Sequence, residues 1–299
     1  MFKIGGSTTQ RFTPRWLPAV TALLACVIGA AQQAPLPQPP QSQTVIKDPA
    51  EQKTYIAALN TQDPAGRAEA LAAFVQQYPH TVVLTDALNQ EMAAWQAAGD
   101  SGQVKRVAKA LLAVDPGNVR ALGIVVALDR VSAEKGDQSV LNEMCLDASG
   151  GMLAVPMWKK PANMTDADFV TLSKLMSQIF VGAQGYCAVT QKNYSQARDW
   201  LTRSLQIDAT NADDTYELAI ADLEMTPEDA NGLWYCAKAI HLAQSTTLPQ
   251  DVSDMTMYCK GKYVKIHGAD DGWDALVQSA GPQNEPPDDF AKQVTPAQK

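Results

Sequence analysis

The sequence contains few of the signals that mark β-strands. No alternating run of valine, isoleucine and threonine is bounded by Asn-Gly or Asp-Gly, and glycine is scarce inside the apolar stretches. Apolar residues instead recur three and four positions apart, which is the period of a helix that buries one face. These absences argue against a β-rich fold, and the sequence predicts an all-α protein.

The motifs of the common catalytic sites are missing as well. The chain has no Gly-x-Ser-x-Gly, no glycine-rich phosphate loop and no His-Glu-x-x-His. Zinc sites need closely spaced ligands such as Cys-x-x-Cys, and no such pair is present. We therefore expect a protein that is not an enzyme, with no catalytic residue, no metal and no cofactor.

Residues 1–31 have the three-part pattern of a secretory signal peptide. Three bases and no acid precede the apolar run "WLPAVTALLACVIGAA", and Gly29 and Ala31 fit the small positions before a cleavage site. The apolar run is about 15 residues, whereas a membrane span needs about 20. We expect cleavage near Gln32, a periplasmic or secreted mature chain, and no membrane span after cleavage. An uncleaved N-terminal anchor is the alternative.

A second alternative comes from "LLAC", residues 23–26, which resembles the lipobox of bacterial lipoproteins. In that interpretation Cys26 carries the lipid. Leu24 is a less usual residue at its position, and the residues after Cys26 remain apolar where lipoproteins usually turn polar. Ordinary cleavage after Ala31 is therefore the favoured prediction.

The chain is also short of basic charge. It has 24 Lys and Arg against 32 Asp and Glu, and removal of Lys3, Arg11 and Arg15 with the signal peptide leaves 21 against 32, a net charge of −11. Such a chain repels phosphate backbones, which argues against binding to nucleic acid and to an anionic membrane surface. No run of like charges occurs, so we expect the acids to be spread over solvated faces.

Proline-rich segments lie at both ends of the expected mature chain. "PLPQPPQSQ" begins at residue 35, and "GPQNEPPDDFAKQVTPAQK" forms residues 281–299. Such compositions favour extended structure without a core. We therefore predict a disordered linker over 32–48, a helical repeat domain over 49–280, and a disordered tail over 281–299.

Turn signals every 12–18 residues divide the central part into helices. Several turns place Asp, Ser or Thr ahead of a helix as an N-cap. Thr226 is expected to cap one helix with Pro227 at its first position, and Asp270 or Asp271 to cap the last. The expected helices lie near residues 50–60, 64–78, 82–98, 101–114, 117–135, 137–149, 165–190, 194–207, 211–225, 228–243, 252–266 and 270–280.

These helices form pairs with a period near 34 residues, which indicates a helical repeat array. The best unit begins near Gln178 and includes "KNYSQARDWLTRSLQID". Gly185 is its small residue on the first helix, Ala197 the small residue where the two helices cross, and Leu201 the large residue one turn later. "VDPGN", residues 114–118, is a typical closing turn of such a unit.

On these residues the chain resembles the tetratricopeptide repeat family, over roughly residues 50–280. The stretch "MYCKGKYVKIHGADDGWDALVQSA" is similar to the end of a group of secreted bacterial members. The resemblance implies a right-handed superhelical solenoid of antiparallel helix pairs. Gln184, Ala188 and Ala209 depart from the repeat pattern, and residues 150–165 are expected to lengthen one turn between units.

Four cysteines remain in the expected mature chain, and an even count in an exported protein suggests disulfides. Three pairings are possible. Cys236 and Cys259 lie on consecutive expected helices, equally far from the turn near residues 247–248, so a Cα separation of about 6 Å is reachable. That pairing leaves Cys145 with Cys187. Buried free thiols are the alternative.

The resemblance also implies a concave groove that holds a protein or peptide and is lined by the first helix of each pair. The protein is then expected to be an interaction scaffold of the bacterial cell envelope, with an unknown protein or peptide partner and no evident small-molecule substrate. The clamp that some members use on a terminal carboxylate is not recognisable. The repeat frame places eight residues in the groove: Asn89, Gln96, Arg120, Arg130, Tyr186, Asp213, Tyr216 and Glu224.

Two other functions stay open at this point. One is a lipid-anchored assembly factor of the envelope, attached through Cys26. The other is an enzyme accessory with a site in "HGADDGWD", between His267 and Asp274. In the simpler interpretation of that segment one aspartate caps the last helix and Asp274 is solvated.

Overall fold

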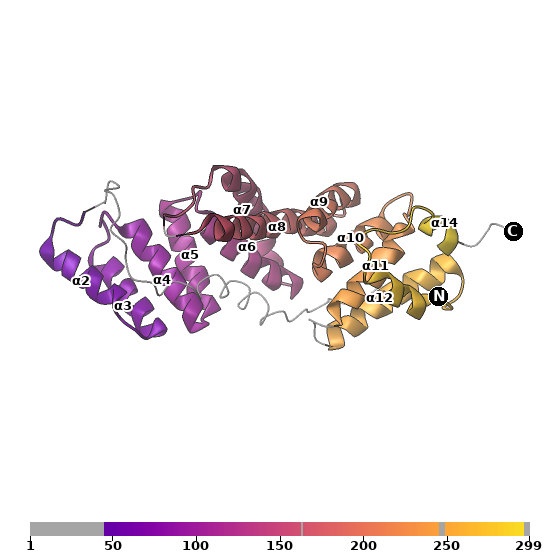
Figure 1. The fold of residues 1–299 in the computed structure, drawn as a ribbon, viewed down its shortest axis with the longest axis horizontal. Coiled ribbons are helices and arrows are strands. Elements are labelled where there is room, and N and C mark those ends of the chain that lie inside the picture. Colours follow the sequence, from indigo (N-terminus) through magenta and orange to yellow (C-terminus); the bar gives the residue numbers. More distant parts are fainter. Residues whose placement is uncertain (1–44, 163, 245–248, 296–299) are drawn as a thin grey trace, which may run out of the picture. The chain divides into compact units, whose positions relative to one another are not determined.

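The structure is a computed structural model that describes residues 45–162, 164–244 and 249–295 (Figure 1). These residues form 13 α-helices and no β-strand, which confirms the all-α prediction. The expected signal peptide, Cys26 and most of the expected linker lie outside the described residues. The α-helices are α2 (Pro49–Leu59), α3 (Pro64–Gln77), α4 (Leu84–Ala98), α5 (Ser101–Val114), α6 (Val119–Glu134), α7 (Leu141–Ala154), α8 (Asp166–Thr190), α9 (Tyr194–Ile207), α10 (Ala212–Glu224), α11 (Asn231–Ala243), α12 (Pro249–His267), α13 (Trp273–Ala280) and α14 (Phe290–Val294).

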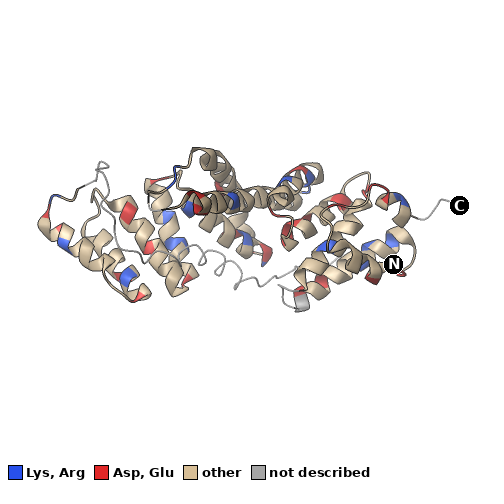
Figure 2. Cartoon of the chain, viewed as in Figure 1, with Lys and Arg blue, Asp and Glu red and all other residues tan. Residues whose placement is uncertain are grey.

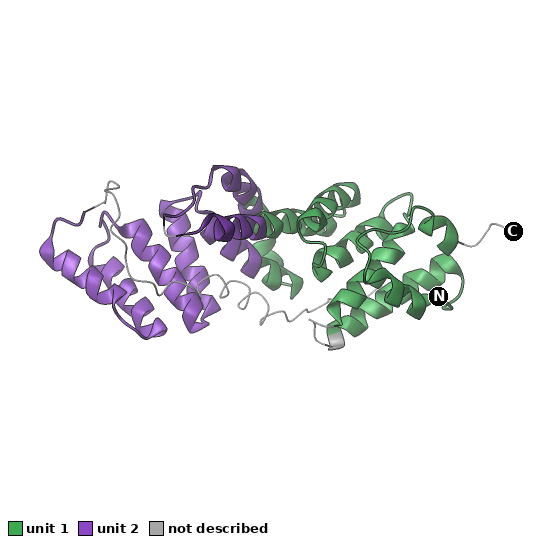
Figure 3. Ribbon diagram, in the orientation of Figure 1, with its two compact units in different colours: residues 1–16, 129–146, 177–299 green, residues 17–128, 147–176 purple. Residues whose placement is uncertain are grey.

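The chain divides into two compact units (Figure 3). Of the described residues, 129–146 and 177–295 belong to the first unit, and 45–128 and 147–176 belong to the second. Each unit has its own buried clusters of apolar side chains. Leu233, Trp234 and Trp273 are central in the first unit, and Leu71 and Phe74 belong to a cluster of the second.

Side-chain caps begin many of these helices. The carboxylate of Asp63 accepts a hydrogen bond from the backbone N–H of Gly66 at 2.7 Å, and that of Asp100 accepts one from Gln103 at 2.9 Å. Asp48, Asn193 and Asn211 cap α2, α9 and α10 in the same way. Because these caps and the apolar period agree, the order and approximate bounds of the predicted helices are confirmed.

Two predicted caps are wrong. Helix α11 begins at Asn231, and Thr226 lies ahead of it, joined to Pro227 by a cis peptide bond. Asp229 instead accepts a hydrogen bond from the N–H of Asn231 at 2.9 Å. Helix α13 is preceded by Gly272, whose φ of 84° is a left-handed conformation that glycine adopts without strain. Neither Asp270 nor Asp271 caps it.

The predicted long turn over residues 150–165 is partly helical. Helix α7 continues through "GG" to Ala154, and a 3₁₀ turn follows at Val155–Met157. A second 3₁₀ turn, Gln138–Val140, precedes α7. Gly151 and Ala154 are buried, so these small residues mark a closely packed helix face and not a turn.

The ends of the helical region also differ from the prediction of disorder. Ile46 is buried in a cluster with Tyr55 and Phe74, although it lies within the expected linker. Phe290 and Val294 of α14 are buried in the large core cluster of the first unit. Each is an apolar residue in a proline-rich or acidic context, and its burial against existing helices favours the ordered arrangement of the described residues around it.

The packing of α8 on α9 confirms the interpretation of the best sequence unit. Ala197 and Leu201 have no exposed surface. A Cβ atom at Gly185 would lie 2.5 Å from Cγ of Leu201, which is closer than real contacts allow. The absence of a side chain at Gly185 therefore lets Leu201 pack directly on the backbone of α8.

Both predicted disulfides are present. Cys236 and Cys259 join α11 to α12 with a Cα separation of 5.6 Å, and Cys145 and Cys187 join α7 to α8 with 6.1 Å. Disulfides of this kind are typical of proteins in an oxidising compartment. In the part of the chain that the structure describes, no helix is long and apolar enough to cross a membrane.

Loss of the Cys236–Cys259 bond should destabilise the first unit. The two cysteines are 23 residues apart, so the chain-entropy argument predicts that Cys236→Ser with Cys259→Ser lowers the free energy of unfolding by about 3–4 kcal/mol. Thermal unfolding of oxidised wild type and double variant measures the effect. A reductant should lower the wild-type Tm further than that of the double variant. Equal Tm values in oxidised samples would contradict the prediction.

Candidate functional site

An ion-pair network around Arg130 joins two helices that are far apart in sequence. The Arg130 side chain, 13% exposed, extends from α6. Its Nη1 lies 2.8 Å from Oδ1 of Asp214 and its Nη2 lies 3.0 Å from Oε1 of Glu217, both on α10. Its Nε lies 3.0 Å from Oε1 of Glu134, one turn along α6. The planar guanidinium therefore uses three of its nitrogens on three carboxylates.

Asp214 is the most enclosed member of this network. Its side chain has no exposed surface and accepts hydrogen bonds from Ser204 Oγ at 2.5 Å and Gln178 Nε2 at 3.0 Å, in addition to Arg130. Gly182 of α8 makes room for this arrangement. A Cβ atom at that position would lie 2.9 Å from Asp214 Oδ1 and 3.0 Å from Arg130 Nη1. The backbone of α8 thus lies directly against the ion pair.

Acidic groups outnumber the single arginine in this network. Burial would lower the pKa of Arg130, but the charges of Glu217, Asp214 and Glu134 outweigh it and raise that pKa well above its ordinary value. Burial raises the pKa of Glu134 and of Glu217, against the opposite effect of Arg130. Burial, followed by the charge of Glu134, raises the pKa of Asp213 to about 8.

We call Arg130, Glu134, Asp213, Asp214 and Glu217 the Arg130 cluster. Four carboxyl groups share one cation, and no hydrogen bond or ion pair connects the partly exposed Asp213 side chain to another described residue. One oxygen of Glu217, Oε2, is buried and accepts no hydrogen bond from the described residues. The cluster therefore has unused acceptor capacity and excess negative charge. Figure 2 shows acidic residues on successive helices along the chain.

Tyrosine rings lie beside the cluster. Cζ of Arg130 lies 5.6 Å from the ring centroid of Tyr186, within cation–π range. Tyr216, on the same helix as Asp213, meets Tyr258 of α12 edge to face at 6.0 Å. The Tyr258 hydroxyl donates to Glu224 at 2.9 Å. Burial is the main cause of the raised pKa of all three phenols, so they are neutral donors at physiological pH.

The structure brings some of the eight predicted groove residues together. Arg130, Tyr186 and Asp213 meet in the Arg130 cluster and at its edge. Glu224 lies farther along α10, where it pairs with Lys262 of α12 at 2.9 Å, and Tyr216 packs on Tyr258. These five residues all belong to the first unit.

The other three predicted residues belong to the second unit and make separate contacts. Asn89 donates to the backbone carbonyl of Thr85 at 2.8 Å. Oε1 of Gln96 is buried and accepts no hydrogen bond from the described residues. Burial lowers the pKa of Arg120. These contacts do not gather the three side chains into one site.

Sequence reasoning missed Glu134, Asp214, Glu217 and Gln178. Two spacings contained the signal: Glu134 follows Arg130 by four residues and Glu217 follows Asp214 by three, so each pair shares a helix face. The long-range pairing of Arg130 with α10 depends on how the helices pack, and no local pattern reveals that.

The segment from His267 to Asp274 forms a packed corner between α12 and α13. Nδ1 of His267 lies 2.9 Å from the carbonyl oxygen of Val294, and the Tyr263 hydroxyl donates to the carbonyl of Asp271 at 2.8 Å. Trp273 is buried beside Tyr263. Asp270 is exposed and pairs with Lys260 at 3.1 Å. These contacts fix the chain direction at the end of the helical region.

Comparison with known proteins does not assign this chain to a family. No family model matches the chain, and no curated protein is significantly similar to it. Among the described residues, no group of three or more His, Cys, Asp and Glu is arranged to hold a metal ion.

The close approach at Gly182 predicts a specific defect. Gly182→Ala should push Asp214 away from Arg130 and lower the free energy of unfolding by about 1–3 kcal/mol, the usual effect of overpacking. Gly261→Ala is the matched control, because Gly261 is exposed on α12 with open space around its Cβ position. That variant should gain about 0.5–1 kcal/mol. Urea unfolding measures both, and equal behaviour of the two variants would contradict the packing argument.

The raised pKa of Asp213 predicts a pH-dependent stability. Between its ordinary value of 3.8 and about 8, the folded protein holds a proton that the unfolded chain has lost. The contribution of Asp213 to stability therefore falls as pH rises through this range. Asp213→Asn should raise the Tm by several degrees at pH 9 and by progressively less toward pH 4.

Thermal unfolding at pH 4, 6 and 9 tests this prediction. The other acids of the Arg130 cluster are present in both proteins, so the difference between variant and wild type is the quantity to follow. Asp199→Asn, at an exposed position on α9, is the control and should follow the wild type at every pH. A Tm difference for Asp213→Asn that does not grow with pH would show that Asp213 titrates normally.

Proposed function

We propose that this chain is an exported, tetratricopeptide-like solenoid that holds a segment of another protein, without catalysing a reaction. Support for the architecture comes from the order of short capped helices, from the packing of Leu201 on Gly185, and from the resemblance over residues 50–280. Two disulfides favour a periplasmic or extracellular location.

The Arg130 cluster is the proposed binding surface. Its residues come from α6 and α10, and Gly182 and Tyr186 of α8 lie against it. These three helices are the first helices of successive pairs in the repeat frame. In helical repeat arrays the same helix of each repeat contributes to one extended surface. Asp251 of α12, the next first helix, also acts electrostatically on Asp213. Helices α6, α8 and α10 carry six of the eight residues that were predicted to line the groove.

The excess of carboxylates is the observation that favours this surface over others. Burial, followed by the charge of Glu134, raises the pKa of Asp213 to about 8. A lysine or arginine from a partner would pair with Asp213 and remove the repulsion among the acids. Tyr186 would offer its ring to the same cation or to an apolar neighbour. The proposed ligand is therefore a protein segment with a basic anchor residue.

Attachment through a lipid on Cys26 would change where this scaffold works and leave its binding surface unchanged. The mass of the mature N-terminal peptide distinguishes the two forms. No contact of the His267–Asp274 corner favours an enzyme accessory, so that function is not proposed.

A charge-matched pair of variants tests the proposal. Wild type, Asp213→Lys and Asp199→Lys are expressed with a tag in cells of the source organism, cross-linked in place and purified, and bound proteins are quantified by mass spectrometry. Both substitutions change the net charge by two, but Asp199 is exposed on α9 and outside the cluster. We expect a partner that is recovered with wild type and Asp199→Lys and reduced at least tenfold with Asp213→Lys.

The partner segment then provides a second readout. It should contain a Lys or Arg whose replacement by Gln weakens binding to purified wild type about tenfold, and this affinity should rise from pH 6 to pH 9 as Asp213 loses its proton. Equal recovery of the partner with Asp213→Lys and with wild type would show that the binding surface lies outside the Arg130 cluster. Absence of any partner would oppose the scaffold function itself.

A further inference from the structure

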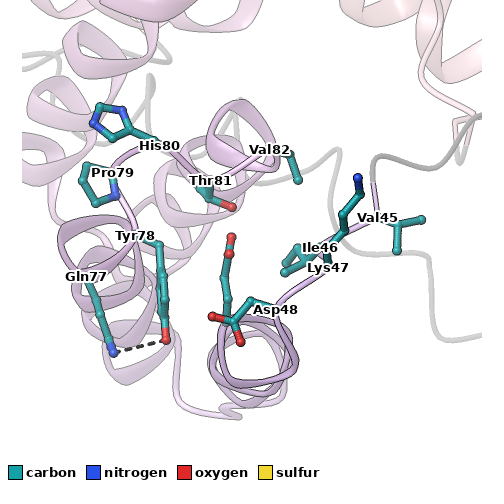
Figure 4. A pocket seen from close by; sticks show the side chains of 11 residues that line it. Val45, Ile46, Lys47, Asp48, Gln77, Tyr78, Pro79, His80, Thr81 and Val82 are labelled. Atoms are coloured by element: carbon teal, nitrogen blue, oxygen red, sulfur yellow. Dashed lines mark hydrogen bonds between the residues drawn. The ribbon is translucent and has the colours of Figure 1, made fainter.

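The second unit contains a pocket that the proposed function does not use. It has a volume of about 540 Å³, within the range of sites for small organic ligands. One wall is residues 45–48 and Glu51 at the start of α2, and the other is residues 77–82 between α3 and α4 (Figure 4). Both walls belong to the second unit, so the pocket is separate from the Arg130 cluster.

Apolar side chains form much of the lining. Ile46 and Tyr78 lie in or against the buried cluster of this unit. Val45 and Val82 border the pocket from opposite walls, and each has 59% of its surface exposed. Figure 4 shows them on the two segments that line the pocket, with the Lys47 side chain between them in this view. Two exposed valines in the lining offer contact to an apolar body of a ligand.

One acceptor in the lining lacks a donor. Oε1 of Glu51 is buried and accepts no hydrogen bond from any described residue. A buried carboxylate oxygen without a donor is rare in folded proteins and loses its hydration without compensation. Rotation of a carboxylate about its last torsion is soft, so either oxygen of Glu51 is able to turn to a donor in the pocket.

The other polar groups of the pocket are largely committed. Oδ1 of Asp48 accepts from the backbone N–H of Ala50 at 2.8 Å as the cap of α2. Gln77 Nε2 donates to the Tyr78 hydroxyl at 3.2 Å, as Figure 4 shows. Lys47 is exposed, and two carboxylates stand against its one ammonium in the lining. The charge balance therefore favours a cation over an anion.

We infer that this pocket binds a primary ammonium group carried on a short apolar body, with Glu51 as its hydrogen-bond acceptor and Val45 and Val82 against its carbon chain. A free alkylamine and a lysine side chain of a peptide share this chemistry. The ammonium supplies the donor that Glu51 lacks, and a charge-assisted bond of this kind is stronger than a neutral one.

Matched probes test the inference on the full mature chain. n-Hexylamine and n-hexanol have the same carbon chain and differ in charge. Acetyl-Leu-Lys-Leu-amide and acetyl-Leu-Gln-Leu-amide are the corresponding charged and uncharged peptides. Binding is followed by NMR titration of the labelled protein at pH 7. We expect n-hexylamine or the lysine peptide to bind at least tenfold more tightly than its uncharged match, with shifts at residues 45–51 and 77–82.

Variants assign the effect to Glu51. Glu51→Gln keeps the shape and should remove the tenfold preference, whereas Glu69→Gln, at an exposed position of α3, should leave it intact. If n-hexylamine binds and the lysine peptide does not, the ligand is a small molecule. If the peptide binds and the amine does not, the ligand is a protein segment. Unchanged preference in Glu51→Gln, or no saturable binding of either cation, would overturn the inference and leave a water molecule as the partner of Glu51. Asp213→Lys should not alter any of these titrations.

Discussion

The ion pairs of Arg130 are the interaction on which the first unit depends. They connect α6 to α10 across 84 and 87 residues of sequence, and the backbone of α8 lies against them at Gly182. Removal of one partner from a buried, hydrogen-bonded ion pair leaves an uncompensated charge, which costs about 3–5 kcal/mol. The network thus fixes the packing of three helices, and the same charges give their shared surface its chemistry.

Different residues of the Arg130 cluster stabilise the helix packing and serve the proposed binding function. Asp214 is enclosed and accepts from Arg130, Ser204 and Gln178, which holds the helices together. Asp213, the preceding residue on α10, is partly exposed, and its pKa is raised to about 8, first by desolvation and then by the charge of Glu134. Two adjacent residues of α10 therefore differ in role. Asp214 stabilises the helix packing, whereas Asp213 would be stabilised by a cationic ligand.

Much of the fold could be read from local sequence, because its signals are local. Asp63 and Asp100 cap helices within three residues, and Leu201 needs only the small residues Gly185 and Ala197 nearby. Prediction of the Cys236–Cys259 pair required only the length of one hairpin. The site was less accessible: Arg130, Tyr186 and Asp213 were predicted through the repeat frame, but Glu217 and Asp214 join Arg130 through packing over more than 80 residues. The acidic, proline-rich composition around Phe290 predicted disorder. The burial of this one aromatic side chain in the core was therefore missed.

The arrangement of the two disulfides simplifies oxidative folding. Cys145 pairs with Cys187 and Cys236 pairs with Cys259, so the two covalent loops follow each other and do not overlap. Each of these four cysteines thus has its native partner as a direct neighbour in the order of synthesis. In the proposed export, with the N-terminus leaving the cell first, the Cys145–Cys187 bond would be able to close before Cys236 and Cys259 reach the oxidising compartment.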